Sequence, residues 1–476
     1  MRVFDRLFID NDWCDSVTGR RFAAVDPATE EVIAELPLAG ADDVEAAVRS
    51  SQRAAAAWRR EAPERRGELL DRLADVIEDH RDVLAEMETR DMGKPLRESH
   101  ANVTRSVRTC RYYAGAVDKL LGDSIPVGHQ GYNFTVHEPL GVTAHITPWN
   151  YPFANACRSL PTALAAGCTV ILKPASQTCL TTLMLGDLCR QAGFPPGVVN
   201  VVTGSGAEAG QALARHPAVR GITFTGSVDT GRRIMQFAAE HIRPVVLELG
   251  GKNPQVVFAD ADVDAALAQT LRGAFTNAGQ VCTSVSRVLV ERPLYAEYVE
   301  RLAARVAAYT VGPGMEDPDI GPLVSQEHWT TVARYADQAR AEGARLVTGG
   351  DRPAGLPRGY FFAPTVFDQV APDMRIAREE VFGLLLSVIP FDTDDQALAI
   401  SNALPLGLTS GVFTRDIGRA MRFARDLQAG MVWINEWFQS PVQVPHGGIK
   451  ESGLGREQGM LALANYTQVK DIAIRF

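Results

Sequence analysis

The sequence lacks the features that would place it in a membrane or on nucleic acid. Its longest apolar run, around residues 162–172, is interrupted by Gly167 and is far shorter than the ~20 residues that cross a bilayer. Residues 1–10 carry two aspartates and no long apolar core, so we expect no signal peptide. A formal net charge of −9 is unfavourable for binding phosphate backbones or anionic lipids. We therefore expect neither nucleic acid nor a membrane as a partner.

Cysteine and histidine are too sparse and too scattered to build a disulfide framework or a metal site. The seven cysteines include no Cys-x-x-Cys pair, and an odd number suits a reducing compartment. The nine histidines are spread along the chain, and no group of His, Cys, Asp and Glu has the spacing of metal ligands. We expect a cytoplasmic protein without a metal ion.

Short apolar strands alternate with amphipathic helices, which is typical of an α/β protein with a doubly wound sheet. The 476 residues are too many for one ordinary core, so we expect about two or three domains. The apolar periodicity predicts strands over 169–172, 198–202, 221–225, 255–258 and 287–290. It predicts helices over 42–58, 64–88, 180–191, 228–240 and 264–275.

Two alternating segments, residues 124–137 and 466–474, differ from this pattern. Each is expected to form an edge strand with unsatisfied backbone groups along one side. Because such a strand gains hydrogen bonds by pairing with another strand, the two segments indicate an oligomer.

Cys282 is the candidate nucleophile. A lone cysteine in an apolar segment is usually a small buried hydrophobe, which fits Cys168 and Cys189. Cys282 differs because Gly279 and Thr283 leave space and polarity around it. A thiol in such a setting can attack a carbonyl carbon, with the inert buried cysteine as the alternative.

Glu248 is the candidate general base. It lies between two leucines and is followed by Gly250-Gly251, which allow the backbone to approach closely. A half-buried carboxyl has a raised pKa and suits general-base catalysis. The alternative is an ordinary surface carboxylate on an alternating strand.

Asn150 is the candidate oxyanion donor, in the segment Thr147-Pro148-Trp149-Asn150. Its amide and the backbone N–H of Cys282 would stabilise the oxyanion of a tetrahedral intermediate. The alternative is a turn residue after Pro-Trp. With Cys282 and Glu248, it predicts oxidation of a carbonyl compound through a covalent thioester.

The chain has no G-x-G-x-x-G fingerprint, so dinucleotide binding must be argued from other segments. Gly226-Ser227 turns a predicted strand directly into a helix, whose free N–H groups can hold a pyrophosphate. Lys173 ends a strand where open α/β sheets bind nucleotides. Glu380 could bind a ribose diol, and Phe382 could contact a nicotinamide ring. Each segment has a structural alternative. In these alternatives, Ser227 simply caps a helix, Lys173 is an exposed lysine at a strand end, and the carboxylates at Glu380 mark the start of a helix.

Taken together, these motifs resemble the aldehyde dehydrogenase superfamily along essentially the whole chain. The segments that carry the resemblance, in order, are Thr147-Pro148-Trp149-Asn150, Leu172-Lys173-Pro174-Ala175, Phe224-Thr225-Gly226-Ser227, Leu247-Glu248-Leu249-Gly250-Gly251, Gly279-Gln280-Val281-Cys282, Glu380-Val381-Phe382-Gly383 and Gly447-Gly448-Ile449-Lys450-Glu451-Ser452-Gly453.

The resemblance implies a subunit of three parts that assembles into a homodimer or homotetramer. An NAD(P)-binding, Rossmann-like domain would comprise residues 1–120 and 139–249. An α/β catalytic domain would comprise residues 250–450. A small β oligomerisation flap would comprise residues 121–138 and 451–476.

The resemblance also implies a mechanism. Cys282 attacks an aldehyde to give a thiohemiacetal, with Asn150 stabilising the oxyanion, and hydride passes to the nicotinamide. Glu248 then activates the water that hydrolyses the thioester to a carboxylic acid. Relatives that transfer the acyl group to coenzyme A usually lack the glutamate, and a non-catalytic relative would lack the nucleophile. Glu248 and Cys282 therefore argue against these two alternatives.

The cofactor is NAD or NADP on this resemblance. The residues implied for its site are Thr147, Pro148, Trp149, Lys173, Ser176, Gly226, Ser227, Gly250, Glu380 and Phe382. Many NAD-preferring members carry glutamate at the position of Ser176, where a carboxylate repels the 2′-phosphate of NADP. Because serine removes that repulsion, we expect NADP to be used at least as readily as NAD.

Arg158 and the segment 173–177 resemble succinate-semialdehyde dehydrogenases, in which two arginines bind the substrate carboxylate. The second arginine of those enzymes is Thr276 here, and their second loop cysteine is Ser284. A small semialdehyde such as succinate semialdehyde is the expected substrate. The alternative for Arg158 is an ion pair inside the domain.

Aromatic and imidazole side chains near residues 437–446 leave other substrates open. Trp437-Phe438 and His446 resemble pocket walls of relatives that oxidise amino- or betaine-type aldehydes, where aromatic faces hold cations, or aromatic aldehydes. We assign Trp437 and His446, with Arg158, to the substrate site.

Overall fold

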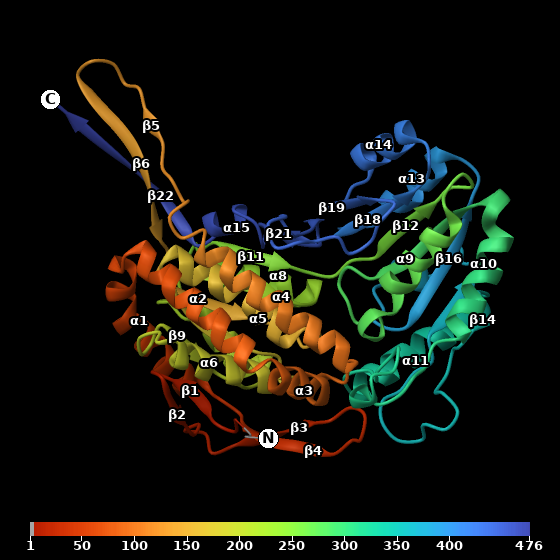
Figure 1. Cartoon of the computed structure of the whole chain (residues 1–476), viewed down its shortest axis with the longest axis horizontal. Coiled ribbons are helices and arrows are strands. Elements are labelled where there is room, and N and C mark those ends of the chain that lie inside the picture. The colour runs from red at the N-terminus through yellow and green to blue at the C-terminus, as the bar shows by residue number, and fades with distance from the viewer. Residues whose placement is uncertain (1–3) are drawn as a thin grey trace.

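A mixed eight-stranded sheet organises the half of the molecule on the left of Figure 1, and the computed structural model describes residues 4–476. Its five central strands are parallel, and antiparallel strands border them on both sides. In spatial order the strands are β2 (Asp12–Cys14), β1 (Leu7–Ile9), β9 (Val199–Val201), β8 (Thr169–Lys173), β7 (Val142–Ile146), β10 (Gly221–Thr225), β11 (Val245–Glu248) and β21 (Gly453–Leu454).

Helices cover both faces of this sheet. Their apolar side chains pack against those of the strands in two clusters, one on each face. They are α1 (Ala41–Arg60), α2 (Pro63–Asp79), α3 (Arg81–Met92), α4 (Leu96–Ala114), α5 (Pro152–Ala166), α6 (Leu180–Ala192), the π-helical turn η1 (Gly206–Gly210), α7 (Gln211–Arg215) and α8 (Val228–Ala239). The doubly wound α/β prediction is confirmed.

One predicted helix is wrong. The apolar period of residues 64–88 predicts a single helix, but the chain breaks at His80 into α2 and α3. His80 has non-helical dihedral angles, and its ring Nδ1 lies 2.8 Å from the Val76 carbonyl oxygen at the end of α2. Apolar residues on both sides of the break face the same core, so the period alone does not reveal it.

A seven-stranded sheet organises the other half, parallel except for one edge strand. In spatial order the strands are β14 (Arg345–Thr348), β15 (Thr365–Asp368), β16 (Leu385–Phe391), β13 (Val285–Glu291), β12 (Asn253–Val257), β18 (Thr409–Phe413) and β19 (Met431–Ile434). Its helices are α9 (Val263–Phe275), the 3-10 turns η2 (Thr276–Gly279) and η3 (Gly314–Glu316), α10 (Arg292–Ala307), α11 (Gln326–Ala341), α12 (Arg375–Arg378), α13 (Asp394–Asn402) and α14 (Ile417–Asp426).

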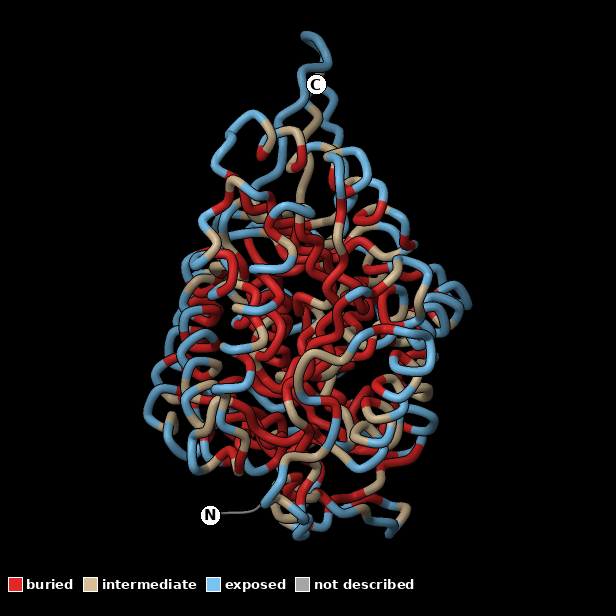
Figure 2. Tube along the Cα trace, turned by 90° about the vertical axis from the view of Figure 1, so that its right-hand side faces the viewer, coloured by how far each residue is buried: buried red, intermediate tan, exposed pale blue. Residues whose placement is uncertain are grey.

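A three-stranded sheet projects from the body at the upper left of Figure 1. It contains β5 (Ser124–Ile125), β6 (Gly131–Pro139) and β22 (Thr467–Arg475). The prediction of an edge strand holds for residues 466–474, since β22 lies at one edge of this sheet, but it is wrong for residues 124–137, which form β5 and β6. β6 is the middle strand, because it pairs with β5 on one side and with β22 on the other, from Thr467 opposite Pro139 to Arg475 opposite Gly131. In this projecting sheet, which we call the flap, β5 and most of β22 are exposed, whereas β6 is half-buried (Figure 2).

Smaller elements complete the chain: β3 (Arg21–Val25) with β4 (Val32–Pro37), β17 (Leu406–Gly407) with β20 (Ile449–Lys450), and α15 (Leu461–Ala464). Within the predicted oligomerisation segment 451–476, β21 joins the eight-stranded sheet and only β22 joins the flap. Across residues 4–476, no helix is long and apolar enough to cross a membrane.

Candidate active site

A cavity of about 560 Å³ lies where loops of the two large sheets meet. Residues 148–151 follow β7, Gly226 and Ser227 follow β10, and Glu248 ends β11. Cys282 and Phe382 reach the same cavity from loops before β13 and β16. The cavity therefore lies at the carboxyl ends of the parallel strands of the eight-stranded sheet, where open α/β sheets bind their ligands, and faces the amino ends of β13 and β16.

Cys282 lines this cavity on a tightly held loop. Before it, Asn277 and Ala278 have left-handed dihedral angles, with φ of 51° and 56°. The Asn253 side-chain amide donates to the carbonyl oxygens of Cys282 and Ser284, both at 2.8 Å. Burial raises the pKa of the Cys282 thiol to about 11, although the charge of Arg158 opposes this shift. At neutral pH the sulfur is therefore a thiol that needs a base before it can attack.

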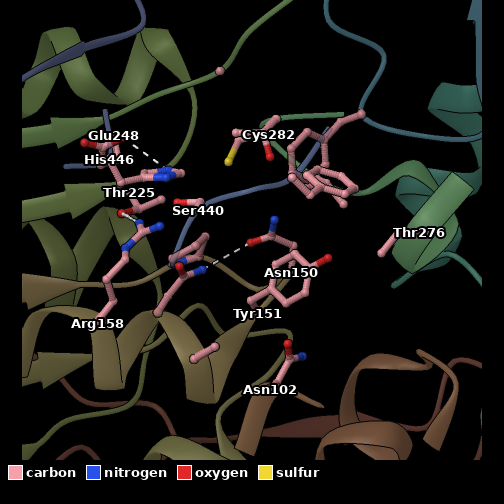
Figure 3. Close-up of a pocket in the computed structure, with 18 of the residues that line it drawn as sticks. Asn102, Asn150, Tyr151, Arg158, Thr225, Glu248, Thr276, Cys282, Ser440 and His446 are labelled. Atoms are coloured by element: carbon pink, nitrogen blue, oxygen red, sulfur yellow. Dashed lines mark hydrogen bonds and ion pairs between the residues drawn. The ribbon is translucent and has the colours of Figure 1, made fainter. Parts of the chain in front are cut away.

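Glu248 is buried, and its side chain faces the same space in Figure 3. Burial, followed by the nearby Glu457 carboxyl, raises its pKa well above the usual range. His446 Nε2 lies 3.9 Å from Glu248 Oε2. Burial and the charge of Arg158 lower the pKa of His446 well below its usual range, so the imidazole is neutral and the contact is not an ion pair.

Asn150 is buried beside the loop that carries Cys282. Its Nδ2 donates to the Gln280 carbonyl at 3.0 Å, and its Oδ1 accepts from Asn155 Nδ2 at 3.4 Å. Because an amide nitrogen has two N–H groups, the second remains available to the cavity. The three predicted catalytic side chains thus surround one space (Figure 3).

The predicted cofactor residues lie at the ends of neighbouring strands. Thr147 and Lys173 end or follow β7 and β8, and Thr147 Oγ1 is buried without a hydrogen-bond partner. Among the described residues, Lys173 Nζ donates to the Pro174 carbonyl alone, at 2.9 Å, and burial lowers its pKa. Ser227 caps α8 by accepting from the Thr230 N–H at 3.3 Å.

The other end of the predicted cofactor site is built by Glu380 over Gly250. Glu380 Oε1 accepts from the Gly251 N–H at 3.1 Å, and burial raises its pKa to about 7. A Cβ atom on Gly250 would lie 1.9 Å from Glu380 Oε2, so a larger residue there would displace the Glu380 carboxyl. The row offers an unpaired hydroxyl, a buried lysine, a helix N-terminus and a carboxyl that can accept hydrogen bonds from a ribose. Together these groups fit a dinucleotide.

Aromatic rings line the same cavity as this row and Cys282. The Trp149 ring lies 5.2 Å from the Phe382 ring, edge to face, and Pro148 lines the cavity beside them. His328 was not predicted: its ring lies 5.2 Å from Trp149, and its Nε2 lies 2.8 Å from the Phe382 carbonyl oxygen. That hydrogen bond supports the left-handed Phe382, whose φ is 61°.

Arg158 lines the cavity but already has an acidic partner. Its Nε forms an ion pair with Glu457, whose side chain is buried, while the Arg158 side chain is 11% exposed. Its Nη2 donates to Thr225 Oγ1 at 3.2 Å (Figure 3). The structure therefore shows the internal ion pair that was the alternative for Arg158, and this charge is balanced before any substrate enters.

The assignment of Trp437 to the substrate site is wrong. Its ring is fully buried, and its indole N–H donates to the Thr283 carbonyl at 3.0 Å, below the Cys282 loop. Trp433 and Phe438 line the cavity instead. Left-handed dihedral angles at Asn435 and Phe438 reverse the direction of successive side chains, which sequence alternation does not reveal.

Sequence reasoning also missed one face of α4. Asn102, Arg105 and Thr109 line the cavity from this helix. Their spacing of three and four residues places them on one side of a helix, so a polar stripe was the available signal. Arg105 Nη2 donates to the Ser440 carbonyl at 3.2 Å.

Comparison with known proteins assigns this arrangement to a class of nucleotide-dependent oxidoreductases. A model of the aldehyde dehydrogenase family matches residues 13–472. A putative aldehyde dehydrogenase of Bacillus subtilis is 43% identical over 98% of this chain and 95% of its own length. A hydroxyisobutyraldehyde dehydrogenase of Mycolicibacterium austroafricanum is 43% identical over 98% of this chain and 93% of its own. Betaine aldehyde dehydrogenase of Staphylococcus aureus, solved with NAD⁺, superposes with a TM-score of 0.98 at 38% identity, covering 100% of this chain and 95% of that one.

The chain belongs to the aldehyde dehydrogenase family. It is an NAD(P)-dependent enzyme that oxidises small aldehydes, as the motifs predicted, and its fold is that of the family.

Proposed function

We propose that this enzyme oxidises its aldehyde through a thioester on Cys282, with Asn150 as oxyanion donor and Glu248 as general base. The observation that carries the proposal is that these three side chains, from separate parts of the chain, line one cavity. When bound, an NAD(P) cofactor would supply the hydride acceptor. Thr147, Trp149, Lys173, Ser176 and Ser227, together with the other residues of the cofactor row, would hold it.

The route begins at Cys282. The thiol loses its proton to solvent, Sγ bonds to the aldehyde carbon as the C=O π bond breaks, and the carbonyl oxygen becomes an oxyanion next to the Asn150 amide. Departure of a hydride leaves the thioester. Glu248 then takes a proton from water, the hydroxide adds to the thioester carbon, and the C–S bond breaks to release the acid and the thiolate.

We propose further that the substrate carries a negative group, as in a small semialdehyde such as succinate semialdehyde. Support comes from the charges that line the cavity. Arg158 is paired with Glu457, and Arg272 lies 3.4 Å from Glu436. Within residues 4–476, Arg105 donates to the Ser440 carbonyl, and its nearest titratable neighbours are Arg158, Tyr151 and Cys282, none of them a carboxylate. An arginine without a counter-ion in a binding cavity favours a carboxylate and disfavours a quaternary ammonium group.

The alternative substrate is a betaine-type, amino or aromatic aldehyde. The rings of Trp433 and Phe438 in the cavity and the likeness to a betaine aldehyde dehydrogenase support it. Transfer to coenzyme A and a non-catalytic role lack comparable support, since the carboxyl of Glu248 and the thiol of Cys282 are both at the cavity.

Arg105→Met tests the substrate class. We expect kcat/KM for succinate semialdehyde to fall by about 10- to 100-fold, because a charge-assisted hydrogen bond is lost, while kcat/KM for butanal stays unchanged. Steady-state cofactor reduction measures both. The matched control is Arg111→Met on the same helix, where the arginine pairs with Asp75 outside the cavity. A wild type that prefers betaine aldehyde to succinate semialdehyde would overturn the proposal.

We also propose that NADP is used at least as readily as NAD, which Ser176→Glu tests. Ser176 is half-buried beside Lys173, and its hydroxyl contacts only Gln177 Oε1, at 3.4 Å. A glutamate there should lower kcat/KM for NADP at least about tenfold and spare NAD, because its carboxylate repels the 2′-phosphate. Gln177→Glu, one residue further into solvent, is the control. A large preference of the wild type for NAD would contradict this proposal.

We propose that the flap joins subunits of a cytoplasmic homo-oligomer, a dimer or a tetramer. Support comes from its exposed apolar side chains, such as Val469 and Ile474, and from the free state of all seven cysteines. Removing residues 467–476 should lower the mass found by light scattering. Tyr466 is retained because its hydroxyl lies 2.9 Å from Thr223 Oγ1 inside the body. An unchanged mass would exclude β22 as an assembly element, and cell fractionation tests the location.

A further inference from the structure

A buried ion pair lies directly behind the turn that carries Asn150. Lys94 follows the C-terminal end of α3, its Nζ lies 2.7 Å from Glu88 Oε1, and both side chains are fully buried. The same ammonium group donates to the main-chain carbonyl of Asn150 at 3.0 Å. It also lies 4.0 Å from the centre of the Tyr151 ring. The proposed reaction steps use neither member of this pair.

The carbonyl of Asn150 is also held from the side of the nucleophile. Asn277 Nδ2 donates to it at 3.0 Å, and the main-chain N–H of Asn277 lies 3.1 Å from a carboxyl oxygen of Glu98. The Asn150 side chain in turn donates to the Gln280 carbonyl, two residues before Cys282. The orientation of the Asn150 amide relative to Sγ therefore depends on how these donors hold its main chain.

The charged pair is shielded from the substrate while remaining next to the cavity. Asn102 lines the cavity, and its Nδ2 donates to Glu88 Oε1 at 3.0 Å, so it separates the pair from the substrate. A buried ion pair contributes little net stability, because the loss of hydration offsets the attraction. Its directed contact is the charge-assisted hydrogen bond to Asn150, which is stronger than one from a neutral donor.

We propose that Lys94, held in place by Glu88, is a positioning residue that fixes the Asn150 amide for oxyanion stabilisation. This inference rests on the proposed role of Asn150. Losing the ammonium lets the turn of Asn150 relax, so the donor no longer points at the place where negative charge develops. Because the oxyanion forms only during the reaction, the effect falls on kcat and leaves KM unchanged.

The test is a double-mutant comparison. Glu88→Gln/Lys94→Met removes both charges together, so no unpaired charge is left buried. We expect kcat to fall at least about tenfold, while the KM values for aldehyde and cofactor stay within about twofold of the wild type. The single variant Lys94→Arg, with Glu88 in place, should keep most of the wild-type kcat because it retains the positive charge. In an Asn150→Ala background the same double substitution should lower kcat no further, because the donor it positions is absent.

The control separates positioning from stability. Arg66 is a buried cation of the same half that donates to the carbonyls of Glu61 and Ala165, away from the cavity. Arg66→Met should lower the melting temperature without lowering kcat. If Glu88→Gln/Lys94→Met does not fold, Glu88→Gln alone weakens the hold on the ammonium and gives the same comparison with a smaller loss.

The outcomes are distinct. A normal kcat in the folded double variant, or a loss that multiplies with that of Asn150→Ala, overturns this inference alone. Full activity of Asn150→Ala overturns the oxyanion role itself.

Discussion

Replacing Cys282 with alanine is expected to lower kcat/KM at least about 10³-fold with every aldehyde, whatever its charge. Without Sγ no thiohemiacetal forms, and neither the Asn150 amide nor the Glu248 carboxyl can take its place as a nucleophile. Cofactor binding should persist, because Lys173, Ser227 and Glu380 are untouched. Steady-state cofactor reduction measures the loss, and fluorescence titration of the cofactor measures its binding.

Cys14→Ala is the matched control for this substitution. Cys14 is also a half-buried free cysteine, but it lies in β2 at the far edge of the eight-stranded sheet. Its loss should leave kcat/KM within about twofold of the wild type. Activity in Cys282→Ala above about a tenth of the wild type would show that the covalent route is wrong.

The side chains proposed as catalytic could be selected from the sequence because each stands out from its own segment. Cys282, Glu248 and Asn150 are polar or reactive groups beside glycine or proline, where the backbone turns toward an open space. The parallel strands were predictable for a similar reason, since short apolar runs bounded by turns are typical of strands that are buried on both faces of a sheet. Asn150 and Glu248 meet at the carboxyl ends of β7 and β11, as this sheet arrangement predicts, whereas Cys282 reaches the cavity from the loop before β13.

The rest of the cavity could not be found in this way. Arg105 lies on an ordinary amphipathic helix, and its importance depends on which carboxylates lie near it in space. Arg158 and Glu457 are 299 positions apart in the sequence, so no local sequence pattern predicts that they form a pair. Such balances of charge decide whether an arginine is structural or free for a ligand.

Backbone reversals account for the wrong aromatic assignment. Trp433 and Trp437 lie in contact, with ring centres 5.0 Å apart, yet only Trp433 faces the cavity. The left-handed residues Asn435 and Phe438 are neither glycine nor expected to adopt this conformation, so the reversal was hidden. The break at His80 was hidden for a related reason, because both helices keep the same apolar face.

Replacing Glu248 with glutamine is expected to separate the two halves of the reaction. The thiol of Cys282 can still be acylated, so the first turnover should release about one equivalent of reduced cofactor per site. Hydrolysis of the thioester then lacks its base, and steady-state kcat should fall about 10²- to 10⁴-fold. Rapid mixing with absorbance detection resolves the burst, and intact-protein mass spectrometry should show the acyl group on the enzyme.

The raised pKa of Glu248 also predicts the direction in which kcat changes with pH. Burial, and then Glu457, raise the pKa of Glu248, so the active carboxylate is scarce at low pH and becomes populated as the pH rises. Wild-type kcat should therefore increase as the pH rises above the range in which an ordinary glutamate ionises, and the increase should be absent in Glu248→Gln. Glu379→Gln is the control, because that carboxyl bonds to Tyr335 and Arg375 outside the cavity. Loss of the burst together with the steady-state rate would instead assign Glu248 to the acylation half, as the base that removes the proton of Cys282.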